Sequence, residues 1–112
     1  MIRAIVVDDE PLMVRKFVRL AENIPDLDII GQFTDAESAI AFSRDNEIGA
    51  AFLDVEMPDM DGFELAHRLK EIRNDVLIVP VTAYENYIFE ANQTGVDYYV
   101  VKPYTTEVLE KM

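Results

Sequence analysis

Apolar residues recur along the chain in two alternating patterns. Runs of strand length occupy residues 2–7, 27–33, 50–55, 77–81 and 98–101. The segments between them are about 10 to 15 residues long and carry apolar positions at helical spacing. Strands that alternate with helices are typical of a parallel sheet in an α/β domain. We therefore predict five parallel strands joined by helices.

Residues that begin and end helices mark the segments between the strands. Pro11 suits the first position of a first helix, and Pro25 closes that helix. Thr34 begins a capping-box pattern of the form Thr-x-x-Glu, which predicts a second helix from there to about residue 46. Asp61 begins a similar pattern, Asp-x-x-Glu, before a third helix. A weaker fourth helix is expected to end at Gly95.

Each of the first three helices carries an apolar stripe that we predict to face the sheet. The stripes consist of Met13, Phe17, Leu20, Ala21 and Ile24, then Ala36, Ala39 and Ile40, then Leu65, Leu69 and Ile72. A fifth helix begins near Thr105 and stops at Met112 without a cap or a polar tail. We expect this last helix to be truncated, so that residues 1–112 form one domain at the N-terminal part of a longer protein.

Composition narrows the classes of protein that fit. The chain has 112 residues, half of them apolar, which suffices for one core. It has 10 Lys and Arg residues and 22 Asp and Glu residues. The resulting net charge of −12 repels nucleic acid and anionic lipid. The absence of cysteine excludes thiolate chemistry and fits a cytoplasmic location. No apolar run has the length of a membrane helix.

Polar residues follow four of the predicted strands. In a doubly wound, flavodoxin-like sheet of order 2-1-3-4-5 with helices on both faces, ligands bind outside the carboxyl ends of the strands. Strands one and three are neighbours in that order, so Asp8 and Asp9 from strand one lie close to Asp54 from strand three. The polar strand ends are Asp8-Asp9-Glu10, Asp54-Val55-Glu56, Thr82-Ala83 and Lys102-Pro103.

Three carboxylates in a small space repel one another unless a cation lies between them. Oxygen ligands without Cys or His suit Mg²⁺, which makes Mg²⁺ the expected cofactor. Asp54 is then placed to attack a phosphorus atom. Lys102 from strand five and Thr82 from strand four can contact the oxygens of the transferred phosphoryl group. The pattern predicts one site for phosphoryl transfer.

Each of these residues has a simpler interpretation when it is considered alone. Asp54 could only form a turn or cap a helix, Thr82 could cap the fourth helix, and Lys102 could be a solvated surface lysine. His67 lies off the apolar stripe of its helix, which favours an exposed residue over a ligand. The joint position of the polar residues at four strand ends favours the single site.

Four segments together resemble bacterial response-regulator receiver domains, and the resemblance covers almost the whole chain. The segments are Val6-Val7-Asp8-Asp9-Glu10-Pro11, Leu53-Asp54-Val55-Glu56-Met57-Pro58-Asp59-Met60-Asp61-Gly62, Val81-Thr82-Ala83 and Val101-Lys102-Pro103.

The resemblance implies a function in two-component signal transduction. Asp54 would take a phosphoryl group from the phosphohistidine of a sensor histidine kinase. Mg²⁺ would be held by Asp9, Asp54, the backbone carbonyl of Glu56 and, more indirectly, Asp8. Beyond this self-phosphorylation and autodephosphorylation, the resemblance implies no conventional enzyme activity.

The resemblance also implies a switch. Thr82 and Lys102 would sense the phosphate, and Tyr99 on strand five would swing inward when Thr82 moves. A cis bond between Lys102 and Pro103 is common in the family and would help to aim the lysine. The output surface would be helix four, strand five and helix five, which could form a homodimer or dock an effector, most often to control transcription.

Three other functions belong to related α/β folds. A pseudo-receiver would keep the fold as an interaction domain without the switch, but Asp9, Asp54, Thr82 and Lys102 are all present. A phosphohydrolase of the haloacid dehalogenase type would need an Asp-x-Asp signature, but Asp8 and Asp9 are adjacent instead of alternate, and the chain has no room for the substrate-selecting cap. A nucleotide-binding module would need a phosphate-cradling loop after strand one, where this chain has acidic residues.

Overall fold

A computed structural model of the chain describes residues 2–55, 57, 60, 62–82 and 100–101. Strands and helices alternate along it as the apolar pattern predicts. The elements are β1 (Ile2–Val7), α1 (Pro11–Ala21), β2 (Leu27–Phe33), α2 (Ala36–Asp45), β3 (Ala50–Asp54), α3 (Gly62–Ile72), β4 (Leu77–Thr82) and β5 (Val100–Val101). The predicted fourth and fifth helices lie outside the described residues.

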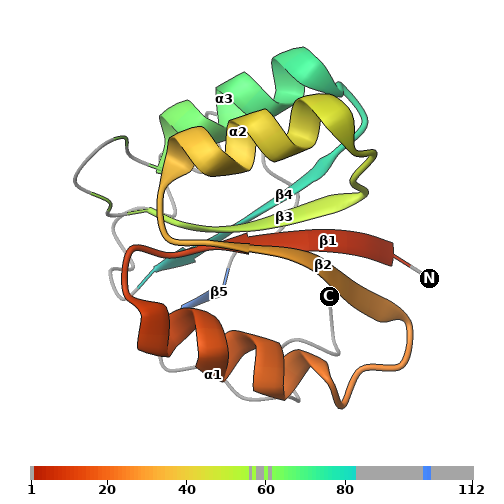
Figure 1. Ribbon diagram of the computed structural model, residues 1–112, viewed down its shortest axis with the longest axis vertical. Coiled ribbons are helices and arrows are strands. Elements are labelled where there is room, and N and C mark those ends of the chain that lie inside the picture. The colour runs from red at the N-terminus through yellow and green to blue at the C-terminus, as the bar shows by residue number, and fades with distance from the viewer. Residues whose placement is uncertain (1, 56, 58–59, 61, 83–99, 102–112) are drawn as a thin grey trace.

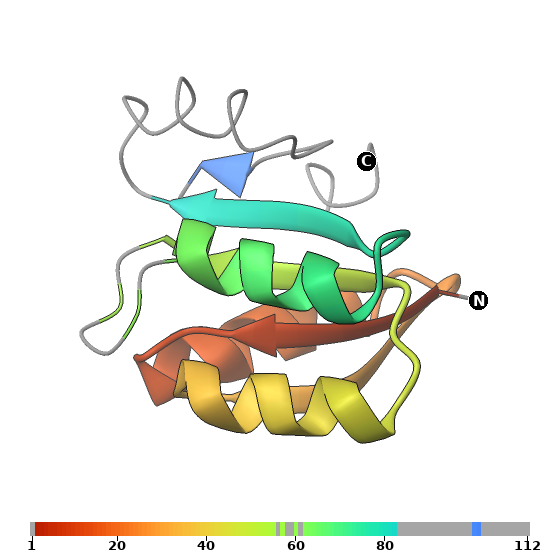
Figure 2. The same cartoon turned by 90° about the horizontal axis from the view of Figure 1, so that it is seen from above.

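The strands form one sheet in the order β2-β1-β3-β4-β5, and every neighbouring pair is parallel. This is the predicted order. Helix α1 covers one face of the sheet, and α2 and α3 lie side by side on the other face (Figures 1 and 2). Right-handed crossovers through helices produce this arrangement, and they bring the carboxyl ends of all the strands to one edge. None of the helices in the described part is long and apolar enough to cross a membrane.

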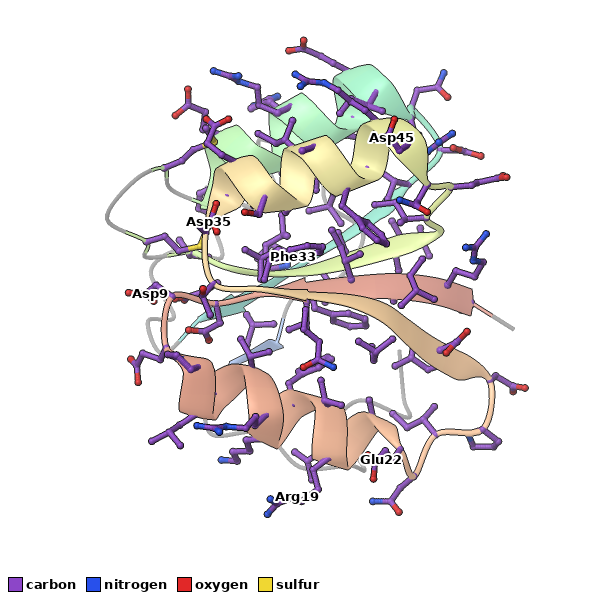
Figure 3. All side chains as sticks on the ribbon, viewed as in Figure 1. Asp9, Arg19, Glu22, Phe33, Asp35 and Asp45 are labelled. Atoms are coloured by element: carbon purple, nitrogen blue, oxygen red, sulfur yellow. The ribbon has the colours of Figure 1, made fainter. Side chains whose placement is uncertain are left out.

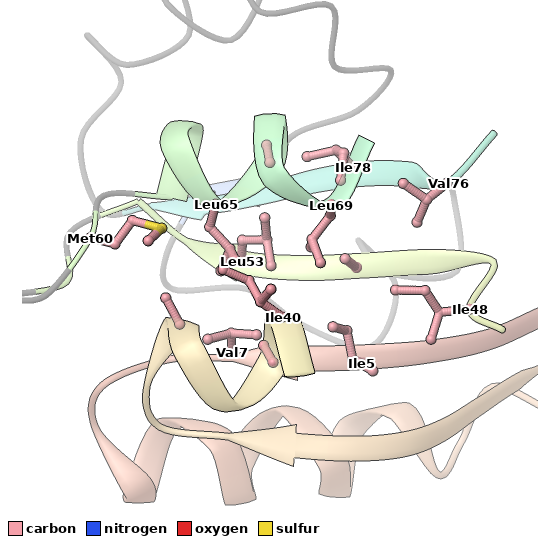
Figure 4. Close-up of a cluster of buried hydrophobic side chains, with 14 residues drawn as sticks. Ile5, Val7, Ile40, Ile48, Leu53, Met60, Leu65, Leu69, Val76 and Ile78 are labelled. Carbon is pink, nitrogen blue, oxygen red and sulfur yellow. The ribbon is translucent and has the colours of Figure 1, made fainter. Parts of the chain in front are cut away.

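Alternation along the buried strands divides the core between the two faces. Ile5, Leu53 and Ile78 belong to the cluster under α2 and α3, and each is 1% exposed or less (Figure 4). Val6 and Phe52 belong to the cluster under α1, where the ring centroids of Phe17 and Phe52 are 4.7 Å apart. Strand β3 is buried along its whole length. Its position is therefore restrained from both faces of the sheet.

The start of the second helix differs from the capping box expected at Thr34. Asp35 is the N-cap of α2, and its carboxylate accepts hydrogen bonds of 2.8 Å from both the backbone nitrogen and the hydroxyl of Ser38. Ser38 thus occupies the third helical position, which Glu37 would have to occupy in the predicted pattern. The prediction was one residue early because an aspartate accepts this bond at least as well as a threonine. The three predicted inward residues, Ala36, Ala39 and Ile40, are buried.

Helix α1 begins as expected, with Pro11 in its first turn and Glu10 as the N-cap. It ends at Ala21, four residues before Pro25, and its last turn is followed by hydrogen-bonded turns to Asn23 and Ile24. In α3, Leu65 and Leu69 are buried and Ile72 packs against the core. The expected cap at Asp61 lies outside the described residues.

An irregularity in the edge strand β2 determines which residue of β1 lies opposite the end of β2. Ala4 pairs with Ile29, whereas Ile5 pairs with Gly31, so the register shifts by one residue and Ile30 is left over as a bulge. The shift brings Phe33 opposite Val7. The end of β2 therefore lies beside the residue that precedes Asp8.

Candidate metal and phosphoacceptor site

The register of the two central strands brings the first and third polar strand ends together. Val6 pairs with Phe52 and Val7 with Leu53 in the parallel ladder between β1 and β3. One residue further along, Asp8 follows β1 and Asp54 ends β3. Both are in phase with the residues that face α1, so strand alternation directs them to the same side of the sheet.

The carboxylates of Asp8, Asp9 and Asp54 form a cluster. One oxygen from each lies within 4.8 Å of one from the others. Asp8 and Asp54 are only 5% and 7% exposed, and Asp9 is more open to solvent. Figure 3 shows Asp9 at the carboxyl end of the sheet, above the start of α1. The sequence-based prediction that these three aspartates converge is therefore confirmed in geometry.

Backbone hydrogen bonds hold the segments that carry the aspartates. The amide of Asp8 donates to the carbonyl of Phe33 at 3.1 Å, and the amide of Glu10 donates to Oδ1 of Asp8 at 3.0 Å. The amide of Val55 donates to the carbonyl of Val81 at 3.4 Å, directly after Asp54. These bonds fix the backbone on both sides of the cluster, so its side chains start from restrained positions.

This donor set fits a hard divalent cation. Burial of two carboxylates beside a third is costly unless positive charge compensates for it. The ligating atoms are all oxygens, which Mg²⁺ prefers, and one partly open aspartate leaves room for water in its shell. A cavity of about 10 Å³, the lower limit for holding one water molecule, is lined by Asp8 and Asp54 and otherwise by apolar side chains such as Phe17 and Phe52.

The remaining predicted site residues are placed only in part. Thr82 ends β4, and its backbone pairs with Val101 of β5, one step beyond the pairing of Asp54 with Val81. Lys102 follows β5 directly in the chain, but it lies outside the described residues. Glu56 and Tyr99 also lie outside them. Their roles therefore stay predictions.

One residue at the site had no assigned role in the sequence. Gly62 begins α3, is buried, and donates its backbone N–H to the carbonyl of Val55 at 2.9 Å. In the sequence it is only the last residue of the segment Leu53 to Gly62. A glycine inside the first turn of a helix is an unusual choice and marks the position, but this signal alone does not indicate the backbone contact behind it.

An open parallel sheet of this order, with an acidic cluster at the ends of the neighbouring strands β1 and β3, defines a flavodoxin-like α/β domain. The response regulator receiver domain family model matches residues 4–112, and the chain belongs to this family. Receiver domains take phosphoryl groups from sensor histidine kinases and bind Mg²⁺ at an acidic pocket.

Individual relatives agree with the family. Sensory transduction protein LytT of Bacillus anthracis is 35% identical over 107 residues, which are 96% of this chain and 44% of LytT. Transcriptional regulatory protein YpdB of Escherichia coli K12 is 30% identical over 114 residues, covering 98% of this chain and 47% of YpdB. The chain thus spans less than half the length of these curated relatives.

Among solved structures, the response regulatory domain of MrkE from Klebsiella pneumoniae has the same fold. It matches with a TM-score of 0.87 and 28% identity, over 97% of this chain and 89% of that domain.

Proposed function

We propose that this receiver domain is a phosphorylation-dependent switch in which Asp54 accepts a phosphoryl group from a sensor histidine kinase in a Mg²⁺-dependent reaction. The observation that carries the proposal is the convergence of three carboxylates, from Asp8, Asp9 and Asp54, within 4.8 Å. Two of the three are buried, which distinguishes the cluster from an ordinary acidic surface patch. Membership in the receiver family supports the same chemistry.

The reaction transfers a phosphoryl group between two side chains. A carboxylate oxygen of Asp54 attacks the phosphorus of a phosphohistidine, an O–P bond forms and the P–N bond breaks. The released histidine nitrogen keeps the electron pair and takes a proton, and Asp54 becomes an acyl phosphate. Because Asp54 ends a strand that is restrained on both faces, its oxygen approaches the phosphorus from a fixed position.

Negative charge on the transferring oxygens requires positive neighbours. Mg²⁺, when bound, neutralises part of this charge. We assign its protein ligands to Asp9, Asp54, the backbone carbonyl of Glu56 and, more indirectly, Asp8. The hydrogen bond from the backbone of Glu10 to Oδ1 of Asp8 orients this carboxylate.

Lys102 and Thr82 complete the proposed site. Lys102 supplies an ammonium group to the phosphoryl oxygens, and Thr82 supplies a hydroxyl donor from the end of β4. Contacts of Thr82 with the phosphoryl group favour one of two arrangements of the domain, and Tyr99 moves inward with it. The switched surface comprises the fourth helix, β5 and the fifth helix, through which two domains could pair.

The output of the switch is proposed to be transcriptional. YpdB is named a transcriptional regulatory protein and LytT a sensory transduction protein, and both are more than twice as long as the matched region. We propose that this chain acts as the receiver part of a longer cytoplasmic regulator, and that DNA binding belongs to another domain. The net charge of −12 supports that division, since it repels DNA.

The test is intact-mass spectrometry after incubation with acetyl phosphate. The wild-type protein should gain one adduct of about 80 Da in the presence of Mg²⁺ and none in EDTA. The variant Asp54→Asn should gain none under either condition. Asp28→Asn serves as the matched control, because Asp28 is an exposed aspartate of β2, remote from the cluster, and it should be modified like the wild type.

Rapid hydrolysis could remove an adduct before it is detected, so beryllofluoride binding is measured alongside. Binding that requires Asp54 and Mg²⁺ supports the switch even without a stable adduct. If neither an adduct nor beryllofluoride binding were detected, the proposal would be overturned in favour of a pseudo-receiver, which interacts with partners without phosphorylation.

A further inference from the structure

We propose that Gly62 is a positioning residue for the phosphoacceptor, and that its lack of a side chain sets the place of Asp54 in the site. This inference rests on the proposed function, because it concerns the same aspartate. Gly62 lies eight residues beyond Asp54 in the chain and begins the helix that packs against the opposite face of the sheet from α1.

The first turn of α3 is in direct contact with the backbone of the phosphoacceptor. A Cβ atom on Gly62 would lie 2.5 Å from the carbonyl oxygen of Asp54, 3.1 Å from its carbonyl carbon and 2.9 Å from Cα of Val55. Contacts below 3.0 Å are closer than Cβ atoms tolerate. All three atoms belong to the backbone, so no side chain can rotate away to make room.

The backbone conformation of Gly62 is not the reason for the glycine. The residue is helical and has no positive φ, so any L-residue could adopt its conformation. What selects glycine here is space alone, as at other places where two backbones approach closely. The hydrogen bond from the Gly62 amide to the carbonyl of Val55, 2.9 Å long, closes the same contact.

Neither side of the contact can yield easily. Helix α3 is anchored by Phe63, Leu65 and Leu69, which are 7%, 0% and 1% exposed. On the other side, β3 is hydrogen-bonded to β1 and to β4 and is buried throughout. An added methyl group must therefore displace the peptide that joins Asp54 to Val55, or push α3 away from it and stretch the hydrogen bond to Val55.

Either displacement moves the reacting carboxylate. Cα of Asp54 is bonded to the carbonyl carbon that the methyl group would press, and the side chain leaves from that Cα on the α1 face. Its companions Asp8 and Asp9 are held separately, at the end of β1. The added methyl group thus shifts one member of the carboxylate cluster against the other two. Misplacement of a reacting group by about 1 Å costs up to about 100-fold in rate.

The other two glycines among the described residues differ from Gly62 in this respect, and one of them provides a control. A Cβ on Gly31 would press mainly on the ring of Phe33, a side chain that can move. A Cβ on Gly49 would meet its nearest atoms, the carbonyl oxygen of Arg3 and a methyl carbon of Ile2, at 3.5 Å, which is ordinary contact. Gly49 precedes β3 at the end of the sheet opposite to the site, so Gly49→Ala adds the same methyl group without touching Asp54.

The experiment compares Gly62→Ala, Gly49→Ala and the wild type. The initial rate of phosphorylation by acetyl phosphate is measured at saturating Mg²⁺ and divided by the folded fraction from circular dichroism. We expect the maximal rate of Gly62→Ala to fall about 10- to 100-fold, and that of Gly49→Ala to equal the wild type. A third variant, Ile78→Val, loses stability from the core under α3 but leaves the Asp54 peptide untouched. It should keep the wild-type rate per folded molecule.

The outcomes separate the two proposals. If the wild type and Gly49→Ala take up no phosphoryl group, the proposed function fails. If they do, and Gly62→Ala reacts at the same rate per folded molecule, only the positioning role fails. Should Gly62→Ala unfold in buffer, the rates of all the variants are measured in trimethylamine N-oxide, which favours the folded state. A variant that stays unfolded even there overturns the inference, because the glycine would then be needed for the fold itself.

Discussion

The aspartate side chains at the carboxyl edge of the sheet differ in burial and in hydrogen bonding. Asp8 is buried and receives a hydrogen bond from the backbone of Glu10, whereas Asp9 is more exposed. Removal of a charge from Asp9 therefore has two separable consequences. It relieves repulsion in the metal-free cluster and weakens the site for a cation.

We predict that Asp9→Asn lowers the affinity for Mg²⁺ about tenfold or more, while its melting temperature in EDTA equals or exceeds that of the wild type. At 100 times the wild-type Kd, Mg²⁺ stabilises the folded state by about 2.7 kcal/mol, and a tenfold weaker site loses about 1.4 kcal/mol of this. The rise in Tm on addition of Mg²⁺ should thus be about halved, as measured by differential scanning fluorimetry.

The matched control for this measurement is again Asp28→Asn, which removes the same charge from the edge strand. Its rise in Tm with Mg²⁺ should match that of the wild type. A full Mg²⁺ effect retained in Asp9→Asn would remove Asp9 from the ligand set.

The residues that carry the proposed chemistry could be predicted from the sequence, but a residue that only positions them could not. Asp8, Asp9 and Asp54 were predictable because carboxylates at the ends of neighbouring parallel strands have a known meeting place. The role inferred for Gly62 was not, because a missing side chain has no chemical signature. Its importance depends on a distance between two backbones that no local pattern encodes.

Among the elements, α2 is the one whose observed N-cap differs from the N-cap expected from the sequence, and substitutions can test which of the two is correct. The expected capping residue was Thr34, but Asp35 accepts both bonds from Ser38. Asp35→Ala should therefore destabilise the domain by about 1 kcal/mol. Thr34→Ala should leave stability within about 0.5 kcal/mol of the wild type, as substitutions at exposed positions usually do.

Urea denaturation of both variants measures these differences through the midpoint at constant slope. If Thr34→Ala proved the more destabilising of the two, the cap would be the one expected from the sequence, and the contacts of Asp35 would be incidental.

Most element positions could be predicted from the sequence, but only some of their ends could. Apolar runs located β1 and β2 to the residue, because burial on a sheet imposes its pattern along the whole strand. The run at 50–55 extended one residue past the end of β3, since Val55 is buried without belonging to the ladder. Helix α1 stopped well before Pro25, because a proline prevents a helix from continuing through its position but does not require the helix to extend that far.

For the molecule as a whole, the excess of acid is the dominant long-range feature. A formal net charge of −12 on 112 residues opposes the compact state through self-repulsion, and added salt screens it. We predict that the Tm in EDTA rises by a few degrees between about 20 mM and about 500 mM NaCl, since screening lengths fall from roughly 20 Å to roughly 4 Å over this range.

Choline chloride distinguishes screening from binding, because this bulky cation cannot enter a cluster of three carboxylates. An equal rise of Tm in choline chloride would assign the effect to the whole charge distribution. A rise confined to NaCl would assign it to occupation of the acidic site by sodium.

The bulge in β2 has a consequence beyond the placement of Asp8. This strand lies at one edge of the sheet, where unpaired amides and carbonyls could recruit a strand from another molecule. The register shift between Ala4 and Ile5 leaves Ile30 out of the ladder and interrupts the regular spacing of those groups, and Asp28 adds an exposed charge to the same edge. We therefore expect the irregularity that brings Phe33 opposite Val7 to disfavour fibril growth from this edge in a concentrated solution of the domain.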